Sequence, residues 1–534
     1  MAYYKDLRDQ IKALEEKGKL IRIARPINKD TEMHPLVRLQ FRGLPEKERK
    51  AWLFENVYDS KGKKYNIPVL IGALGASPQV YAIGLQCQVN EIGKRWAHAQ
   101  AHPIPPVMVK DAPVHEVVYS GKNLLAEGGL GEFPIPLSTP GWDVGPYMTS
   151  PYWVSKDPES GIRNVGTYRA QIKAPDRTGV YIAKYFRGIA YHWRKCRKLG
   201  RPLEAAVIIG APPNVGYTSV SQLPTDVDEY TVAGGISGEP VELVKCKTVD
   251  LEVPARSEIV IEGEISTEEV ELEAPFGEAT GYVGQREMGL IFKVTCITHR
   301  QDPIWQAFIS QFPPSESSVI RQIACANIIP KRLREMGITS LRQAAVHFTN
   351  GSDRFAVLQL GRTNAEEIWG ALEAMPKNFP AFSKIVIAVD EDVDPQNANL
   401  VNWAITYRCQ PHRDTKIVMT HAPDGQDYSV EPPGELPWAF LIEPNQMPEC
   451  SSLLIDATRK WDYPPVSLPK KEYMEEALKL WQEMGLPPLK LQEPWYGYNL
   501  GNWTEEEEEQ AKWAVEGNHY ETGDLMWKRR KKAS

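Results

Sequence analysis

The sequence has little of what marks membrane, secreted or nucleic-acid-binding proteins. No uncharged apolar run approaches the roughly 20 residues that a membrane helix requires. The polar start MAYYKDLRDQ lacks the apolar core of a secretory signal. Lysine and arginine, 62 together, do not outnumber the 69 acidic residues, so the net charge of −7 argues against a phosphate-neutralising surface. We therefore expect a cytoplasmic protein that binds neither membranes nor nucleic acid.

Cysteine and the familiar catalytic signatures are also scarce. The seven cysteines lie far apart and form no C-x-x-C pair, which favours reduced thiols over a disulfide framework. The sequence contains no Walker A, G-x-S-x-G or H-E-x-x-H motif. GGLGEF, at Gly128–Phe133, lacks the preceding strand and the following acidic residue of a dinucleotide site, so it predicts a turn. His98 and His102 stand four residues apart without a third ligand nearby, which favours a surface pair over a metal site.

What is present indicates a large multidomain protein. The chain has 534 residues, of which 42% are hydrophobic and 25% charged, ordinary values for a globular protein. At about 150 residues per domain, this length suggests roughly three domains. We place an N-terminal α/β domain at 1–120, a central domain at 121–325, a C-terminal α/β domain at 326–470 and a helical extension at 471–534.

The central region, from 164 to 300, shows the clearest periodicity. Apolar and polar residues alternate in Ile259–Ile265, in Val249–Val253 and in Leu290–Cys296. A period of two at such regular spacing is typical of half-buried antiparallel strands in a sandwich or barrel. A single helix, predicted over 189–198, interrupts the strands.

Helical periodicity and capping residues define the flanking regions. Apolar spacing predicts a helix over 7–17 that Gly18 ends, followed by a strand over 20–23. Beyond residue 320, helices and strands alternate, which is typical of an α/β domain. There we expect a helix over 318–328 with Pro330 as its stop, a helix over 364–374 capped by Asn364, a strand over 384–389, and a tail helix that begins at Thr504.

One pair of carboxylates differs from the rest. In VELEAPFGEATGY, Glu273 and Glu278 flank a Pro-Phe-Gly turn at the end of an alternating strand. Two carboxylates held close together have pKa values forced apart, which leaves one able to hold a proton near neutral pH. A cation such as Arg169 would select which one ionises. On spacing alone a solvated pair of turn carboxylates is the more common arrangement, and Asn164 and Glu229 are then ordinary surface residues.

Five segments together carry a family resemblance. They are RNVGTYRAQ (163–171), DEYTVAGGISGEPVELVKC (228–246), EAPFGEATGY (273–282), DEDVDPQNANLVNWAITYRCQPHRD (390–414) and LLIDATRKWDYPP (453–465). In this order they resemble the UbiD-type reversible decarboxylases that use prenylated FMN, in the aromatic-acid branch that includes phthaloyl-CoA decarboxylases. The resemblance implies an α+β multidomain fold in which a central, flavin-reductase-like split β-barrel binds prenylated FMN. N-terminal and C-terminal α/β domains and a C-terminal tail flank this barrel.

The resemblance also implies the chemistry. It indicates non-oxidative, reversible decarboxylation of an aromatic or α,β-unsaturated carboxylic acid, or of an aromatic acyl-CoA, through a covalent prenylated-flavin adduct. The implied catalytic residues are Arg169, Glu273 and Glu278, with Glu278 as the proton donor. Two alternatives stay open: a carboxylase of an aromatic hydrocarbon or phenol that uses the same site, and a flavin-binding subunit that does not catalyse alone.

Cofactor and metal contacts follow from the same resemblance. A divalent cation (Mn²⁺, Mg²⁺ or Fe²⁺) would link protein oxygens to the flavin phosphate, with K⁺ beside it, held partly by carbonyls of 218–221. The implied metal contacts are Asn164, Glu229, Thr218 and Ser219. The implied cofactor contacts are Asn164, Val165, Thr167, Tyr168, Arg169, Arg187, Ser219, Glu229 and Arg459.

The chain departs from the family pattern at one metal ligand. A histidine is expected near positions 186–187, but the sequence there reads KYFRG, with Phe186 and Arg187. Either Arg187 binds the flavin phosphate directly, because a guanidinium suits phosphate oxygens, or His192 reaches in from its helix.

Partners are likewise implied by the resemblance. We expect a homo-oligomer, a dimer or a hexamer, with a small aromatic acid or acyl-CoA as the substrate. A flavin prenyltransferase would supply the cofactor. The last 60 or so residues contain Trp495, Tyr496, Tyr498 and Trp503, which makes them too aromatic for plain disorder, and we expect them to pack on a neighbouring subunit.

Overall fold

The computed structural model describes residues 2–182, 188–221, 223–348, 352–421, 427–430, 446 and 448–532. Chain contacts divide it into two compact units. Unit 1 comprises residues 1–402 and 411–456, and unit 2 comprises residues 403–410 and 457–534. Unit 1 contains three sheet-based regions, and each is described below.

The first region is a four-stranded mixed sheet with helices packed on it. The predicted first helix is confirmed as α1 (Leu7–Glu16): Asp6 caps its start, and the chain turns at Gly18 with φ +64°. The strand order is β1-β3-β6-β19, so a strand from far down the chain completes this sheet. Its strands are β1 (Leu20–Ile23), β3 (Ala51–Phe54), β6 (Val69–Ile71) and β19 (Trp305–Ala307), and its other helices are α2 (Met33–Gly43), α3 (Pro78–Gly84) and α4 (Ile92–Ala101). A small second sheet joins β2 (Ile27–Asn28), β4 (Val57–Tyr58) and β5 (Lys64–Tyr65).

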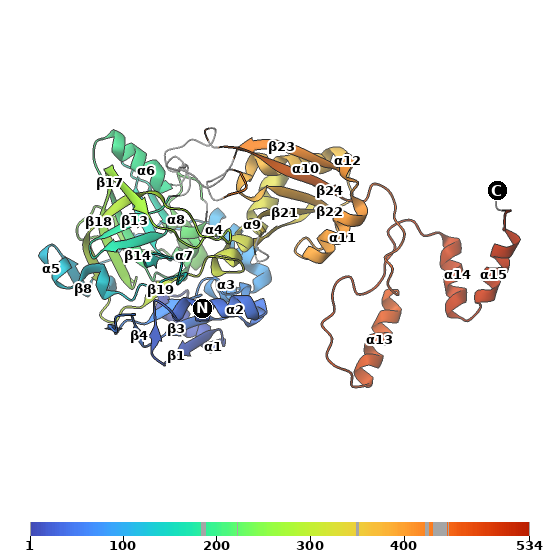
Figure 1. The fold of residues 1–534 in the computed structure, drawn as a ribbon, viewed down its shortest axis with the longest axis horizontal. Coiled ribbons are helices and arrows are strands. Elements are labelled where there is room, and N and C mark those ends of the chain that lie inside the picture. Colours follow the sequence, from blue (N-terminus) through green and yellow to red (C-terminus); the bar gives the residue numbers. More distant parts are fainter. Residues whose placement is uncertain are drawn as a thin grey trace. The chain divides into compact units, whose positions relative to one another are not determined.

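The central region is a nine-stranded antiparallel sheet that curls into a half-barrel (Figure 1). The predicted alternation is confirmed in its long hairpin, β17 (Ile259–Glu273) and β18 (Glu287–His299). The other strands are β8 (Val117–Ser120), β9 (Tyr147–Met148), β10 (Tyr152–Lys156), β11 (Arg163–Thr167), β12 (Ala170–Ala174), β13 (Arg177–Val180) and β14 (Leu203–Ile209). Its helices are α5 (Lys122–Ala126), α6 (Gly188–Lys198), α7 (Pro213–Val220) and α8 (Glu229–Ser237), and β7 (Val107–Met108), β15 (Glu242–Lys245) and β16 (Glu252–Pro254) form a separate small sheet.

The half-barrel encloses an aromatic core that reaches the site described below. Trp153 is fully buried and meets Phe292 edge to face, with ring centroids 4.9 Å apart. Its indole Nε1 donates a 2.7 Å hydrogen bond to the carbonyl of Tyr168. The apolar faces of the strands and this bond fix the chain directly after β11.

The third region is an α/β sheet of order β20-β21-β22-β24-β23. Its strands are β20 (Leu341–His347), β21 (Ser352–Leu360), β22 (Ile385–Asp390), β23 (Thr415–His421) and β24 (Glu449–Ala457). Its helices are α9 (Glu316–Glu335), α10 (Ala365–Asn378) and α12 (Pro411–Asp414), and α11 (Ala398–Arg408) begins in unit 1 and continues into unit 2 from residue 403. Asn364 caps α10 as predicted. The prediction that Pro330 stops its helix was wrong, because α9 continues through it. Buried Ile329 and Leu333 on either side offset the lost backbone hydrogen bond.

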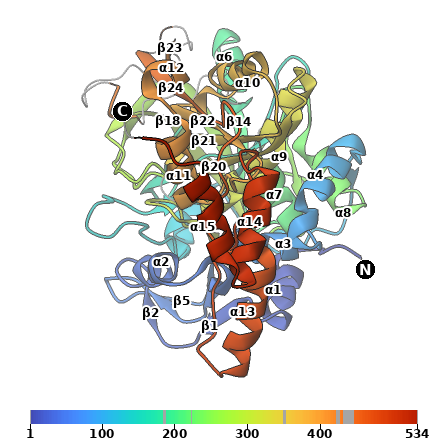
Figure 2. The same ribbon diagram turned by 90° about the vertical axis from the view of Figure 1, so that its right-hand side faces the viewer.

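Unit 2 contains three further helices, of which the last two are joined by a short turn (Figure 2). They are α13 (Lys471–Glu483), α14 (Glu505–Val515) and α15 (His519–Lys528), and none of them has a buried residue. The predicted start at Thr504 is confirmed by a capping box with Glu507. Trp495 and Tyr496 pack edge to face at 5.0 Å. Over the described part of the chain, no helix combines the length and apolarity needed to cross a membrane.

Candidate active site

Asn164 and Glu229 meet although 65 positions separate them. Asn164 Nδ2 donates to Glu229 Oε1 at 2.9 Å, and the backbone N–H of Val165 donates to Oε2 at 2.8 Å. Glu229 is the first residue of α8 and is 4% exposed. Burial raises its pKa to about 8, although these hydrogen bonds act in the opposite direction. The carboxyl therefore binds a proton readily, and a cation placed beside it would displace that proton.

An ion network holds this pair in place. Arg163, the first residue of β11, donates to Asp228 from Nε at 2.9 Å and from Nη2 at 2.6 Å. Its Nη1 donates to Glu252 at 2.8 Å. Asp228 is the N-cap of α8 and accepts from the N–H of Tyr230. The start of β11 is thereby fastened to the start of α8.

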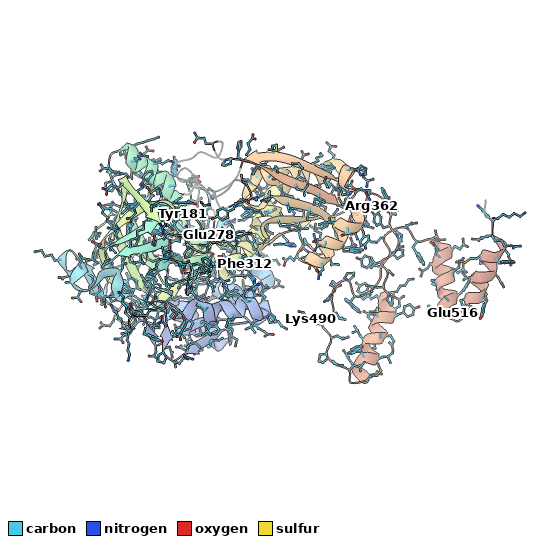
Figure 3. All side chains as sticks on the ribbon, in the orientation of Figure 1. Tyr181, Glu278, Phe312, Arg362, Lys490 and Glu516 are labelled. Carbon is cyan, nitrogen blue, oxygen red and sulfur yellow. The ribbon has the colours of Figure 1, made fainter. Side chains whose placement is uncertain are left out.

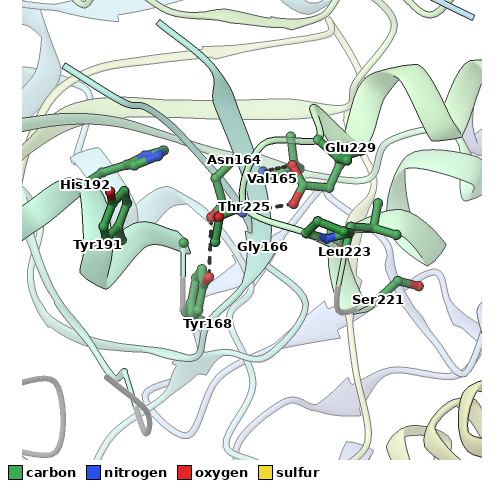
Figure 4. A pocket seen from close by; sticks show the side chains of 14 residues that line it. Asn164, Val165, Gly166, Tyr168, Tyr191, His192, Ser221, Leu223, Thr225 and Glu229 are labelled. Atoms are coloured by element: carbon green, nitrogen blue, oxygen red, sulfur yellow. Dashed lines mark hydrogen bonds between the residues drawn. The ribbon is translucent and has the colours of Figure 1, made fainter. Parts of the chain in front are cut away.

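A pocket of about 310 Å³ opens beside the pair (Figure 4). The pocket is lined by β11, by the end of α7, by the start of α8, by Tyr191 and His192 of α6 and by the 223–227 segment. Gly188 lies so close to Asn164 that a Cβ there would stand 2.4 Å from the amide carbon. The lining residues are Asn164, Val165, Gly166, Tyr168, Gly188, Tyr191, His192, Ser219, Ser221, Leu223, Pro224, Thr225, Val227 and Glu229.

The hydroxyl groups around the pocket face in different directions. Thr167 Oγ1 and Ser219 Oγ lie 2.9 Å apart, and Tyr168 OH donates to Asn164 Oδ1 at 3.4 Å. The hydroxyls of Thr218, Ser219 and Ser221 all donate to carbonyls of α7. Ser219 and Ser221 line the pocket, and Thr218 does not.

Arg169, beyond the end of β11, is clamped between aromatic rings and carboxylates. Its guanidinium carbon lies 3.7 Å from the ring centroid of Tyr181 and 5.1 Å from that of Phe276. Nε donates to Glu273 Oε1 at 2.9 Å, and Nη1 forms an ion pair with Glu278. Burial is the largest single effect and lowers the pKa of Arg169, but the Glu273 charge and hydrogen bond, together with Tyr181 and Tyr147, outweigh it, so the net change is upward.

The two glutamates of the Pro-Phe-Gly turn differ in their surroundings. The Glu273 side chain is 1% exposed, and burial raises its pKa in spite of the Arg169 charge. The Glu278 side chain is 13% exposed. Among the described residues, Glu273 Oε2 has no hydrogen-bond partner. The alternative of a solvated carboxylate pair is therefore wrong for Glu273, and a buried acceptor is left for a ligand.

Three domain families match the chain in order. The N-terminal, Rift-related and C-terminal domains of 3-octaprenyl-4-hydroxybenzoate carboxy-lyase match residues 11–100, 107–313 and 321–457. An uncharacterized protein of Archaeoglobus fulgidus is 31% identical over 513 residues, covering 90% of this chain and 98% of that protein. The chain belongs to the UbiD family. The resemblance inferred from the five motifs is thereby confirmed.

Solved UbiD-class structures share the fold. The enzyme HmfF from Pelotomaculum thermopropionicum in complex with FMN has a TM-score of 0.73 at 29% identity, covering 88% of this chain and 99% of that one. The closed form of Sedimentibacter hydroxybenzoicus vanillic acid decarboxylase has a TM-score of 0.75 at 27% identity, covering 90% of this chain and 100% of that one. The predicted α+β multidomain fold with a central barrel-like sheet is thereby confirmed. Likeness to a flavin reductase stays a prediction.

Three predicted cofactor or metal contacts remain: Arg187, His192 and Arg459. Arg187 lies outside the described residues. His192 lines the pocket, with Nδ1 2.9 Å from Ser155 Oγ, and burial lowers its pKa to about 4. Figure 4 places it on the far side of Asn164 from Glu229. Arg459 belongs to unit 2, where Nη1 donates to the carbonyl of Leu500 at 2.8 Å.

Several residues of the site escaped the sequence reasoning. The aromatic clamp of Tyr181 and Phe276 was missed, although Phe276 stands inside the quoted turn motif. Tyr147 was missed too: its hydroxyl donates to the carbonyl of Ala274 at 2.7 Å, and its ring lies 4.4 Å from that of Phe276. Phe276 lies between Glu273 and Glu278 in the sequence. That position could have indicated that its ring lies close to the two carboxylates.

Proposed function

We propose that this UbiD-family chain is a prenylated-FMN-dependent enzyme that releases CO₂ reversibly and non-oxidatively from an aromatic or α,β-unsaturated carboxylic acid. The observation that carries the proposal is the Arg169–Glu273–Glu278 cluster. One cation is shared by two carboxylates, of which one is buried and one is half-buried. A protein that only bound flavin would gain nothing from this arrangement, because it buries charge at a cost in free energy.

The residues present fit the cofactor. The Glu229 pocket offers amide, hydroxyl and carboxylate oxygens, and Glu273 Oε2 is a buried acceptor without a partner among the described residues. Val165, Thr167, Tyr168 and Ser219 would hold the cofactor's polar end, together with Arg187. When bound, prenylated FMN would supply an electron sink that stabilises the electron pair left behind when the carboxylate departs.

Glu278 is the proposed proton donor at the carbon that loses CO₂. It is more exposed than Glu273 and sits on a turn, so it can exchange protons with solvent between cycles. Arg169 orients both carboxylates through separate nitrogens, which a guanidinium fork permits and a lysine does not. Glu273 keeps Arg169 in place and, with it, contacts the substrate carboxylate. A positioned acid contributes about 10²- to 10⁴-fold in rate.

Asn164 and Glu229 are the proposed protein ligands of a divalent cation, Mn²⁺, Mg²⁺ or Fe²⁺, with K⁺ beside the Thr218–Ser221 carbonyls. Hard oxygen donors suit such ions. The direct hydrogen bond between the pair would give way, since both side chains must then turn oxygens to the ion. In the described part of the chain, no three His, Cys, Asp or Glu side chains converge on a metal-sized site. Water or phosphate oxygens would complete the shell, with Arg187 at the phosphate.

The substrate class is proposed as aromatic acids or aromatic acyl-CoA esters. The same residues serve the reverse reaction, carboxylation of a hydrocarbon or phenol, because the proton donor of one direction is the base of the other. HmfF has been solved in an evolved dimeric form, and we propose that this chain is also a homo-oligomer, a dimer or a hexamer. Unit 2, with its exposed aromatic helices, would contact a neighbouring subunit.

The test uses the full chain produced together with a flavin prenyltransferase. We expect an absorbance spectrum of bound prenylated flavin, and exchange of labelled CO₂ into a panel of benzoic, hydroxybenzoic and cinnamic acids and aromatic acyl-CoA esters. Protein that holds unmodified FMN or an empty barrel, and exchanges no CO₂, would contradict the proposal and favour a non-catalytic subunit. Native mass spectrometry of the same sample gives the oligomer size.

A further inference from the structure

Two arginines of α2, in the N-terminal region, hold the loop that joins β19 to α9. Arg38 and Arg42 lie four residues apart, so they share one face of the helix. Arg38 Nη1 donates to the carbonyls of Phe312 at 2.8 Å and Pro314 at 3.1 Å, and Nη2 donates to the Ser310 carbonyl and the Gln311 side chain. Arg42 Nη1 donates to the Pro313 carbonyl at 2.9 Å. We call residues 310–314 the support loop.

The grip on the support loop is not an ordinary ion pair. All four of these Arg38 hydrogen bonds end on a neutral oxygen of the support loop. Burial, and to a lesser degree Arg42, lowers the pKa of Arg38 to about 10, so it stays charged at neutral pH. Burial of a cation without a carboxylate partner costs free energy of folding, so Arg38 is not explained by packing alone. The guanidinium group has a planar set of donors that can bind four oxygens at once, and an apolar side chain has none.

Gln311 is the residue whose backbone needs this support. Its φ is +71°, a left-handed conformation that residues other than glycine rarely adopt. Its side chain is bonded at both ends: Oε1 accepts from Arg38, and Nε2 donates to Thr139 Oγ1 at 3.1 Å. The Thr139 N–H donates to Asp143 Oδ2 at 2.7 Å. Asp143 Oδ1 accepts a 3.3 Å hydrogen bond from the N–H of Gly277, the residue that directly precedes Glu278.

The support loop is packed directly against the turn that carries Glu278. A Cβ added to Gly277 would stand 2.5 Å from Thr139 Oγ1 and 2.8 Å from Gln311 Cγ. A Cβ added to Gly281 would stand 2.8 Å from the Phe312 ring. Figure 3 labels Glu278 and Phe312 in this area. The two glycines are thus required by close approach, and any shift of the support loop would be transmitted to Glu278.

We propose that Arg38 is a positioning residue for the proton donor, acting through Gln311 and the support loop to fix the Glu278 turn against Arg169. The proposal rests on the function proposed above. Arg38 does not reach the reacting atoms. Its effect is geometric, and a displacement of about 1 Å at a catalytic group costs on the order of 10²-fold in rate.

The test compares Arg38→Met, Arg38→Lys and Gln311→Ala with wild-type holoenzyme. The matched control is Arg22→Met, at a partly exposed arginine of β1 that pairs with Glu15 and Glu55. We expect Arg38→Met and Gln311→Ala to keep flavin occupancy and KM and to lose about 10- to 100-fold in kcat. The double variant should lose no more than the single ones, because both act on one path. Arg38→Lys should recover part of the loss, since it retains donors to the loop, and Arg22→Met should stay within about twofold of wild type.

A second readout separates this proposal from the decarboxylase assignment. Hydrogen exchange of the peptide covering 274–284 should be faster in Arg38→Met and unchanged in Arg22→Met, whether or not any acid is decarboxylated. Protection of that peptide equal to wild type in Arg38→Met would overturn the proposal, as would an unchanged kcat. An inactive wild type with accelerated exchange in Arg38→Met would overturn the proposed function and leave the mechanical link standing.

Discussion

Arg169 Nε donates to Glu273 Oε1 across 2.9 Å, although the two residues lie 104 positions apart and Glu273 is almost fully buried. The same guanidinium pairs with Glu278, and the Tyr181 ring covers its face. A buried carboxylate of this kind depends on its cation, because solvent cannot replace it. The cluster is therefore both a catalytic arrangement and a local element of stability, and its variants should report on both.

Replacement of Arg169 by alanine should destabilise the protein as well as inactivate it. Glu273 would stay buried without its cation, at a cost of about 2–5 kcal/mol in the free energy of unfolding. The thermal midpoint and the bound flavin absorbance of Arg169→Ala measure both effects. Arg177→Ala, at a side chain that is 43% exposed, is the control and should lose under 1 kcal/mol. An Arg169→Ala variant as stable and as active as wild type would show that the cluster is dispensable.

Replacement of Glu278 by glutamine should leave the fold and cofactor intact but remove turnover. An amide has nearly the shape of a carboxyl group but cannot deliver the proton, so the rate should fall by about 10²- to 10⁴-fold. Steady-state kinetics, with deuterium incorporation into the product, check this. Glu268→Gln, an exposed position on the same hairpin, should behave as wild type. Full activity in cofactor-loaded Glu278→Gln would mean that another group donates the proton.

Replacement of Glu229 by glutamine should lower the divalent cation content by about tenfold or more, because a charged oxygen ligand is lost. Elemental analysis before and after EDTA treatment measures this, with the exposed Glu239→Gln as the control. Arg187→His should make the cation harder to remove, since an imidazole adds a ligand where the family has one. If wild type retains its cation against EDTA and Arg187→His changes nothing, His192 becomes the ligand to pursue.

The buried Glu316 carboxyl should give unit 1 a measurable pH dependence. It is 1% exposed, and burial raises its pKa to about 7 even though the N–H groups of Leu74, Gly75 and Ile309 donate to it. A carboxyl whose pKa is raised on folding is most favourable when protonated. Stability is therefore lost as the pH rises from about 4.5 to about 7, by up to roughly 3 kcal/mol.

Glu316→Gln isolates this effect, because an amide does not titrate. At pH 5 the variant should be less stable than wild type by about 1–3 kcal/mol, since one backbone donor loses its acceptor. The difference should shrink as the pH approaches 8. Thermal midpoints of both proteins across this range measure it, with the exposed Glu335→Gln as the control. Parallel pH profiles for wild type and Glu316→Gln would contradict the assignment.

Local patterning determined much of the architecture. In β17 and β18 one face packs on a core and the other faces solvent, so apolar and polar residues alternate along each strand. This alternation can be recognised in the sequence alone. The caps at Asn364 and Thr504 act on N–H groups within one turn, so they too could be predicted. The five motifs, in their order, supplied the family and with it the candidate residues Asn164, Glu229 and the Arg169 cluster. The division into domains at 120, 325 and 470 stays a prediction.

Tertiary structure decided what those residues experience. Whether Pro330 ends a helix depends on the packing of Ile329 and Leu333, not on proline alone. That Glu273 is buried while Glu278 is not, that Tyr181 covers Arg169, and that Arg38 of α2 holds the support loop all join segments far apart in the chain. Burial and the pKa shifts that it causes depend on which distant segments exclude water, and no local pattern carries that information.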